Sequence, residues 1–295
     1  MHAKTLSETP LVALTDVHCR PESPHCGAEE CTATHRLVFP RSGVFVKHVR
    51  GERVVADANH VIFFNACEPY RVSHPVPGGD DCMVLSFADE LLIEALGSGE
   101  GADGGGAVPP FARTHGLLDP HRLLVGRRLR HRAKAGTASA LELEETALTL
   151  LHGIAMAPAE REVGQRRRHR EASARLGRER VEATKLLVAG RPESDLGLGE
   201  IARAVASSPY HLARHFRASV GLPIHQYRLR MRLALALERM LDGRGNLLAL
   251  ALDLGFAGHS HFAAAFKQAF GVTPSAFRRS ASARRVREMR KNLTV

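Results

Sequence analysis

Short apolar runs, rich in β-branched and aromatic residues, recur through the first third of the chain. The four clearest runs are residues 35–39, 44–49, 61–64 and 83–87. Turn signals at 40–43, 57–59 and 77–81 separate them. Short strands at this spacing predict a small barrel or sandwich. By contrast, Pro10, Pro21 and Pro24 interrupt any regular pattern in residues 1–30, which we expect to be irregular.

The apolar pattern then changes to a helical period. Residues 119–134 and 138–155 are predicted to be helices. One stripe along the second helix is formed by Leu141, Ala147, Leu148, Leu151 and Ile154. Two interpretations of this stripe stay open: packing against the predicted sheet, and a seam between two copies of the chain. A glycine-rich run at 97–110 is expected to be a surface loop.

A charged stretch with few large apolar residues, 158–174, separates the strand-rich half from a second helical region. We therefore predict a domain over 1–157, a linker over 158–174 and a helical domain over 175–295. The predicted fold class is α+β, because strands and helices share the first domain and the second is all-α.

The second domain contains one pattern used twice. When residues 198–279 are overlaid on themselves at an offset of 50, the landmark residues align. The aligned pairs are Leu212 with Phe262, Phe216 with Phe266, Gly221 with Gly271, Tyr227 with Phe277 and Arg228 with Arg278. This spacing indicates a supersecondary unit that occurs twice. In each copy a short helix, a turn and a second helix ending at glycine predict a helix-turn-helix, whose second helix lies in the DNA major groove.

The second helix of the first copy has two distinct faces. Its expected N-cap is Ser207 or Ser208, followed by Pro209 in the first turn. The predicted buried face carries Leu212, Phe216 and Val220. The opposite face carries Tyr210, Ala213, Arg214 and Arg217. Arginine donates two hydrogen bonds to guanine, so we assign base reading to Arg214 and phosphate contact to Arg217; a solvated face is the alternative.

The second copy carries smaller side chains at the same places. The offset of 50 places Ser260, Ala263, Ala264 and Lys267 on the corresponding stripe. We therefore expect phosphate contact from Lys267 and weak base reading from the start of this helix. The full set of predicted DNA contacts is Ser208, Tyr210, His211, Ala213, Arg214, Arg217, His259, Ser260, His261 and Lys267. A helix over 224–241, about 27 Å long, would join the copies at nearly the ~34 Å spacing of successive major grooves.

Charge is divided unequally between the two halves. Residues 1–160 carry 15 Lys and Arg against 20 Asp and Glu, a net charge of −5. Residues 161–295 carry 26 against 11, a net charge of +15. A basic half joined to a mildly acidic one indicates a polyanionic partner for the second domain only.

These motifs resemble a known family. The string GFAGHSHFAAAFKQAFGVTPSAFRR at 255–279 resembles the signature of the AraC/XylS family of bacterial transcription regulators, and IARAVASSPYHLARHFRASVG at 201–221 is similar to that family's first helix-turn-helix. The resemblance implies binding to double-stranded DNA in adjacent major grooves near promoters, contact with RNA polymerase during activation, and no enzymatic role. The family's base-reading positions fall on Tyr210, Ala213 and Arg214.

The first domain more loosely resembles the cupin-like effector or dimerisation domains of the same family, on the stretch ADANHVIFFNACEPYRVSHPVPGGDDCMVLSF at 56–87. This resemblance implies a cupin-like barrel, a homodimer formed through the first domain, and an unidentified small-molecule or metal effector. A metal-dependent cupin enzyme fused to a DNA-binding domain is one alternative function. It would need three converging ligands, for which His60, Glu68 and His74 are the nearest candidates. A non-specific nucleoid binder is the other alternative.

Five cysteines lie in the first third of the chain. The N-terminus lacks a signal-peptide core and no segment reaches about 18 consecutive apolar residues, so we expect a cytoplasmic protein with free thiols and no membrane partner. A cluster within 18 residues is formed by His18, Cys19, Cys26, Cys31 and His35. These soft ligands suit Zn²⁺ or another thiophilic metal, or thiol-based sensing; inert packed thiols are the alternative. Cys67 and Cys82 are expected in the core.

Overall fold

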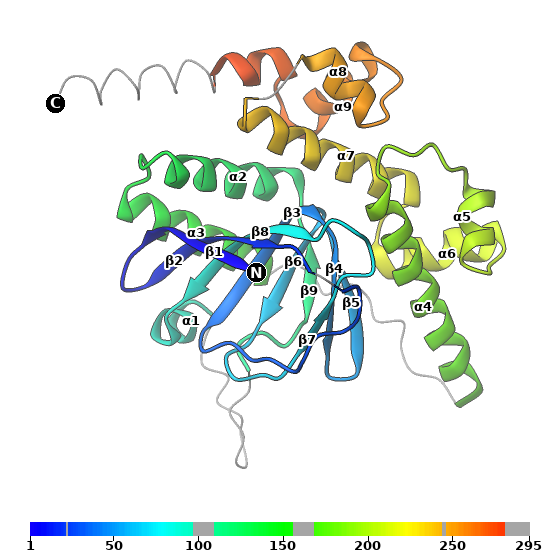
Figure 1. Ribbon diagram of the computed structural model, residues 1–295, viewed down its shortest axis with the longest axis horizontal. Helices are drawn as coiled ribbons and strands as arrows, with labels where there is room; N and C mark the ends of the chain where they lie inside the picture. The colour runs from blue at the N-terminus through cyan, green and yellow to red at the C-terminus, as the bar shows by residue number, and fades with distance from the viewer. Residues whose placement is uncertain (22, 97–108, 156–167, 244–245, 281–295) are drawn as a thin grey trace.

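A computed structural model describes residues 1–21, 23–96, 109–155, 168–243 and 246–280 (Figure 1). Most of the glycine-rich run at 97–110 and of the predicted linker at 158–174 lies outside the described residues. In the part of the chain that is described, the N-terminal half combines antiparallel strands with helices and the C-terminal half is helical. None of the described helices has the length and apolar character needed to cross a membrane.

The strands form two antiparallel sheets. The larger sheet has the order β1 (His2–Glu8), β2 (Val12–Cys19), β8 (Asp80–Phe87), β3 (His35–Gly43), β6 (His60–Phe64) and β9 (His115–Leu117). The smaller has the order β5 (Glu52–Ala56), β4 (Phe45–Val49) and β7 (Arg71–Ser73). The four strand runs expected from the sequence are confirmed. Among the described strands the two sheets do not join into a closed ring, so the predicted cupin-like barrel is not confirmed.

The expectation that residues 1–30 are irregular is wrong, because β1 and β2 form there. Pro10 lies in the turn between these strands and Pro21 follows the second, so neither interrupts a strand. Val12, Leu14 and Asp16 alternate as the buried positions of β2. Residues 40–43 likewise belong to β3 rather than to a turn, because an irregularity in the β3–β8 register between Pro40 and Ser42 accommodates the proline.

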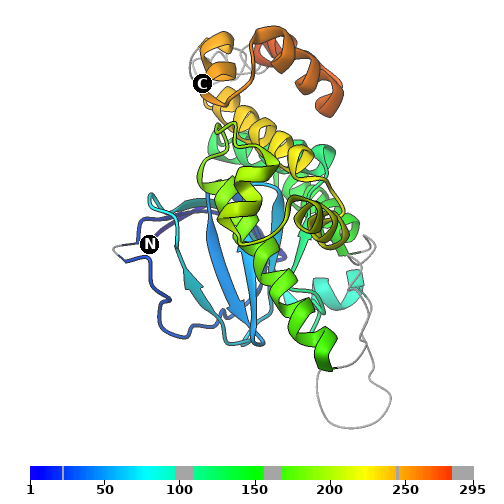
Figure 2. The ribbon, with the colours of Figure 1, turned by 90° about the vertical axis from the view of Figure 1, so that its right-hand side faces the viewer.

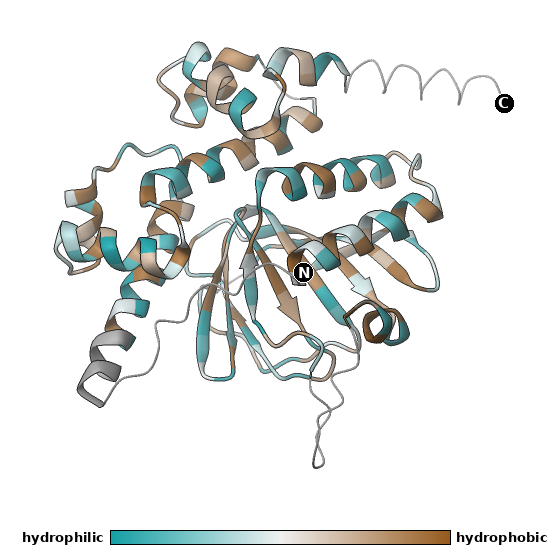
Figure 3. Ribbon diagram, turned by 180° about the vertical axis from the view of Figure 1, so that it is seen from behind, coloured by the Kyte–Doolittle hydropathy of each residue, from teal (hydrophilic) through white to brown (hydrophobic). Residues whose placement is uncertain are grey.

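Alternation along the strands creates two cores, one on each face of the larger sheet. On β3, Leu37 and Phe39 face helices α1 (Asp89–Leu96), α2 (Pro120–Lys134) and α3 (Ala140–Ala155), whereas Val38 faces the smaller sheet. On β6, Phe63 and Ile62 divide in the same way. Figure 3 shows hydrophobic and hydrophilic positions along the same strands. The period of two places the larger sheet as the middle layer.

The predicted helices 119–134 and 138–155 are confirmed as α2 and α3. Asp119 caps α2 by accepting a hydrogen bond from the backbone N–H of Arg122 at 2.9 Å. On α3, the buried side chains include Ala147, Leu151 and Ile154, and the helix packs on α2 and β2. Most of the apolar stripe is thus covered by the same chain, although Leu141 is 63% exposed.

The C-terminal half consists of α4 (Arg168–Gly190), α5 (Leu198–Ala204), α6 (Pro209–Val220), α7 (Ile224–Leu241), α8 (Leu247–Asp253) and α9 (His259–Phe270). Helix α4 begins at Arg168, so part of the stretch predicted as a linker is helical. Helix α4 packs against β5 and α6, and Figure 2 shows it passing in front of the strands. Helix α2 of the N-terminal half packs on α7 and α9.

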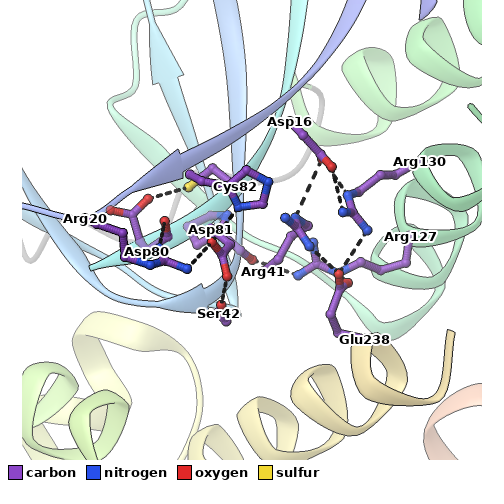
Figure 4. Close-up of polar contacts among 12 residues, drawn as sticks. Asp16, Arg20, Arg41, Ser42, Asp80, Asp81, Cys82, Arg127, Arg130 and Glu238 are labelled. Atoms are coloured by element: carbon purple, nitrogen blue, oxygen red, sulfur yellow. Dashed lines mark hydrogen bonds and ion pairs between the residues drawn. The ribbon is translucent and has the colours of Figure 1, made fainter. Parts of the chain in front are cut away.

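Buried charges join the two halves around Glu238 of α7 (Figure 4). Arg41 of β3 and Arg130 of α2 donate hydrogen bonds to Glu238 Oε1 at 2.5 and 3.1 Å. Arg127 Nε lies 3.3 Å from Glu238 Oε2, and Arg130 also binds both oxygens of Asp16. Burial raises the pKa of Glu238, but the charges of these arginines outweigh burial and lower it. We call these five residues the Glu238 clamp.

Candidate nucleic-acid interface

Helix α6 is the second helix of the first helix-turn-helix. Ser208 is its N-cap, as expected, and its Oγ accepts a hydrogen bond from the backbone N–H of His211 at 3.3 Å. Pro209 occupies the first turn, where no intrahelical donor is required. Gly221 ends the helix with a φ of 77°, and its N–H donates to the carbonyl of Arg217. This left-handed residue stops the helix in the way that glycine permits at least cost.

The two faces of α6 are divided as the sequence predicts. Leu212, Phe216 and Val220 are all buried. Tyr210 is 69% exposed, and Arg214 and Arg217 are also exposed. Within the described part of the chain, no carboxylate pairs with Arg214 or Arg217. Both guanidinium groups are therefore available to a polyanion, although their DNA contacts stay predictions.

Helix α4 supports α6 from behind. An added Cβ at Gly177 of α4 would lie 2.9 Å from His215 Nδ1, so the two helices approach closely there. Burial lowers the pKa of His215, and the charges of Arg214, His211 and Arg180 lower it further. Neutral His215 therefore packs between α6 and α4, a role that the sequence pattern did not indicate.

The second helix-turn-helix, α8 and α9, repeats the first with one added residue. The first helices of the two copies begin at Leu198 and Leu247, an offset of 49, whereas α6 and α9 begin at an offset of 50. The extra residue lies in the turn before α9. Gly255 in this turn has a φ of 76°, and an added Cβ would lie 2.2 Å from the carbonyl oxygen of Glu193. Both the conformation and the close approach require glycine at this position.

Helix α9 exposes a different set of side chains. Phe262 and Phe266 are fully buried, and Ala269 and Phe270 are partly buried. Its exposed residues that were predicted to contact DNA are His259, Ser260, His261 and Lys267. Ala264, the counterpart of Arg214, is exposed and cannot hydrogen-bond to a base edge. Helix α9 ends at Gly271 with a φ of 76°, which repeats the end of α6.

Helix α7 spans the predicted residues and connects the two units. Its arginines were candidates for phosphate or structural contacts. Arg232 is buried and donates to the carbonyls of Pro192 and Gly255 at 2.7 and 2.6 Å. Arg228 donates to the carbonyls of Ser194 and Leu196. Both arginines therefore hold the loop after α4 against α7, which makes them structural residues.

The cysteine cluster expected from the sequence does not assemble. Cys26 and Cys31 are exposed, and among the described residues neither belongs to a group of three potential metal ligands. His18 Nδ1 instead lies 2.8 Å from Asp81, and His35 accepts a hydrogen bond from the backbone N–H of Ala66. The cluster was inferred from proximity in sequence, but β2 directs Cys19 toward a different set of partners.

The remaining ligand candidates are also separated. Cys82 is buried as expected, whereas the prediction of a core position for Cys67 is wrong, because this residue is exposed. The cupin metal set does not converge in the described structure. His60 binds Asp57 at 2.9 Å, Glu68 pairs with Arg50, and His74 lies 2.7 Å from Asp80.

Comparisons with known proteins match the C-terminal half. Residues 201–280 match a family model described as a helix-turn-helix domain. The chain is 31% identical over 93 residues to the HTH-type transcriptional activator AarP of Providencia stuartii, which covers 32% of this chain and 69% of AarP. It is 30% identical over 149 residues to the HTH-type transcriptional regulator ArgR of Pseudomonas aeruginosa, covering 47% of this chain and 45% of ArgR.

The repeated units, their exposed helices and the basic charge of this half define a protein with a double helix-turn-helix DNA-binding domain. With the sequence similarity just described, the chain belongs to the AraC/XylS family of transcription regulators.

The similarity is concentrated in this domain. The chain spans about a third of the length of most curated relatives that it matches, for example 28% of the regulatory protein PocR of Salmonella typhimurium, at 32% identity. The crystal structure of apo ToxT from Vibrio cholerae covers 92% of this chain and 97% of ToxT, with 11% identity and a TM-score of 0.35. These values leave the N-terminal half without an informative structural relative in this pair.

Proposed function

We propose that this protein is a sequence-specific transcriptional regulator that binds double-stranded DNA near promoters. The observation that carries the proposal is the stripe of Tyr210, Arg214 and Arg217, which is exposed on a helix held rigid by its caps and its buried face. Arg214 reads a base edge in one major groove, and α9 lies in the next groove and binds mainly phosphate. Where the protein activates transcription, RNA polymerase is its protein partner.

Selection of bound DNA from a random pool by the purified full chain tests this proposal. The expected result is a consensus with two segments about one helical turn apart, the first more strongly specified than the second. Arg53→Ala on β5 is a matched control, because it removes an exposed positive charge far from α6 in sequence. A bound pool without sequence preference would favour the non-specific nucleoid binder and contradict the proposal.

We infer that the N-terminal half is a regulatory and dimerising domain of the cupin-like type. Its two antiparallel sheets, packed face to face around Val38, Ile62 and Phe64, support this inference. A cavity of about 140 Å³ beside the larger sheet is lined in part by Phe63, Phe111 and Leu151 and suits a small apolar effector. An apolar ligand should raise the melting temperature of the wild type but not of Leu151→Trp, which fills the cavity. Equal shifts would place the ligand elsewhere.

The Glu238 clamp is the proposed route by which the N-terminal half controls the reader. It fixes α7, which carries both helix-turn-helix units, to β3 and α2 of the N-terminal half. Glu238→Ala leaves buried arginines without a partner, which is costly. Hydrogen exchange of α7 amides should therefore become faster in Glu238→Ala and stay unchanged in Arg53→Ala. Unchanged exchange in both variants would show that the clamp does not hold α7.

A further inference from the structure

Three potential metal ligands from separate segments meet in the N-terminal half. Cys19 is the last residue of β2, and its register partner is Asp80, the first residue of β8. His74 directly follows β7 of the other sheet, and its Nε2 lies 2.7 Å from Asp80 Oδ1. One sulfur, one nitrogen and one oxygen atom of these residues therefore lie within 4.8 Å of one another.

This cluster is enclosed on one side and accessible on the other. His74 and Asp80 are 8% and 5% exposed, whereas Cys19 is only partly buried and leaves an entry path. Cys82 lies two residues further along β8, so its side chain points to the same face as that of Asp80. The Cys82 thiol donates to Asp80 Oδ2 at 3.0 Å, which places a second sulfur beside the cluster (Figure 4).

The backbone holds these ligands in place. Gly79 has a φ of +69°, and an added Cβ would lie 2.0 Å from the carbonyl oxygen of Cys19. Gly43 has a φ of +73°, and an added Cβ would lie 2.0 Å from the carbonyl oxygen of Gly79. Three chain segments thus pack too closely for any side chain between them. The ring of Phe45, 6.4 Å from that of His74, further orients the imidazole.

The nearest positive charge is already paired. Arg20 donates to the backbone carbonyls of Cys19 and Asp80 at 2.8 and 3.0 Å and to the carboxylate of Asp81 at 2.7 Å. Its charge is therefore balanced by Asp81, and its hydrogen bonds to the cluster go to the backbone. The carboxylate of Asp80 keeps only His74 and the thiol of Cys82 as side-chain partners.

We propose that Cys19, His74 and Asp80 form a binding site for a thiophilic divalent cation such as Zn²⁺. Thiolate, imidazole and carboxylate are the ligands that Zn²⁺ takes at about 2.0–2.3 Å, in a tetrahedron whose corners lie roughly 3.5 Å apart. Small shifts of the three side chains reach that spacing. Cys82 or water completes the tetrahedron. The ion replaces the hydrogen bond between His74 and Asp80, and the proton of the Cys19 thiol leaves to solvent.

Metal titration of the chelator-treated full chain tests this site. Zn²⁺ should bind at a single site, and Co²⁺ in its place should give the absorption bands of a thiolate-bound tetrahedral ion. Cys19→Ser should weaken Zn²⁺ binding by more than the roughly 10–100-fold lost with an outer-shell partner. The exposed cysteines supply matched controls, so Cys26→Ser, Cys31→Ser and Cys67→Ser should bind like the wild type. No binding by the wild type, or equal binding by Cys19→Ser, would overturn the proposal.

Alkylation of the wild-type chain tests the same site without a substitution that can disturb folding. Zn²⁺ should slow the reaction of Cys19 with a maleimide and leave the rates of Cys26, Cys31 and Cys67 unchanged, as measured by peptide mass spectrometry. Protection of Cys26 or Cys31 instead of Cys19 would assign the ion to the exposed cysteines and contradict the proposal. Neither readout depends on DNA binding, so the metal site and the regulator function can fail separately.

Discussion

Helices α6 and α9 bury similar side chains and end in the same way, yet they offer different groups to solvent. Phe216 and Phe266 are both fully buried, and both helices stop at a left-handed glycine. At the corresponding exposed position, Arg214 on α6 faces Ala264 on α9. The comparison separates two kinds of constraint. Packing maintains the framework in both copies, whereas the exposed face is free to differ and sets what each copy can recognise.

The largest expected effect tests the shared framework. Phe216→Ala and Phe266→Ala each remove a fully buried ring, so each should lower the free energy of unfolding by about 3–5 kcal/mol. Urea unfolding of the two variants measures this. Similar losses would support equal frameworks. A loss under about 1 kcal/mol in only one variant would show that the copies differ in packing as well as in their exposed faces.

Arg214→Ala tests the difference in base reading. It should weaken binding to the selected DNA by about 1–3 kcal/mol and relax the preference at one base position. Competition binding with single-base variants of the site measures both effects. Uniform weakening across all sequences would show that Arg214 contacts phosphate only.

Ala264→Arg approaches the same difference from the other copy. An arginine on the exposed face of α9 should add a guanine preference in the second segment, worth up to about 1–3 kcal/mol. Repeated selection from a random pool with this variant measures the new preference, and Ala257→Arg, at an exposed position outside α9, is the charge-matched control. The same consensus as the wild type would mean that α9 does not enter a groove.

Arg217→Ala and Lys267→Ala test the phosphate contacts that the two copies are expected to share. Each substitution should reduce the slope of log K against log salt by about 1, because each removes one phosphate contact. Binding to the selected site over a range of salt concentrations gives the slope. A normal slope for Lys267→Ala alone would leave α9 without the gripping role assigned to it.

The smallest effect is a pH dependence confined to the first copy. Burial lowers the pKa of His215, and the counterpart of His215 on α9 is Ala265. The unfolded chain therefore binds a proton at higher pH than the folded chain, and stability falls as pH drops below the ordinary value of 6.5 toward the lowered pKa. His215→Gln should reduce the loss of stability between about pH 7.5 and pH 5. Unchanged pH dependence would place the titrating group elsewhere.

Sequence periodicity predicted the elements of the C-terminal half with accurate bounds, since each helix there is set by local signals. Ser208 and Pro209 begin α6, Gly221 ends it, and the three-to-four spacing of its apolar residues identifies the buried face. The same reasoning failed at β1 and β2. There the prolines lie between strands, and only pairing with β8 stabilises the extended conformation.

By itself, the sequence determined the repeated helix-turn-helix, the faces of its helices and the family to which the chain belongs, because these depend on residues close together along the chain. The tertiary structure decided which distant residues meet. Glu238 joins arginines from β3 and α2, and Cys19 meets His74 and Asp80 instead of Cys26 and Cys31. Such contacts depend on strand register and on packing between layers, and neither is encoded in the spacing of residues along one segment.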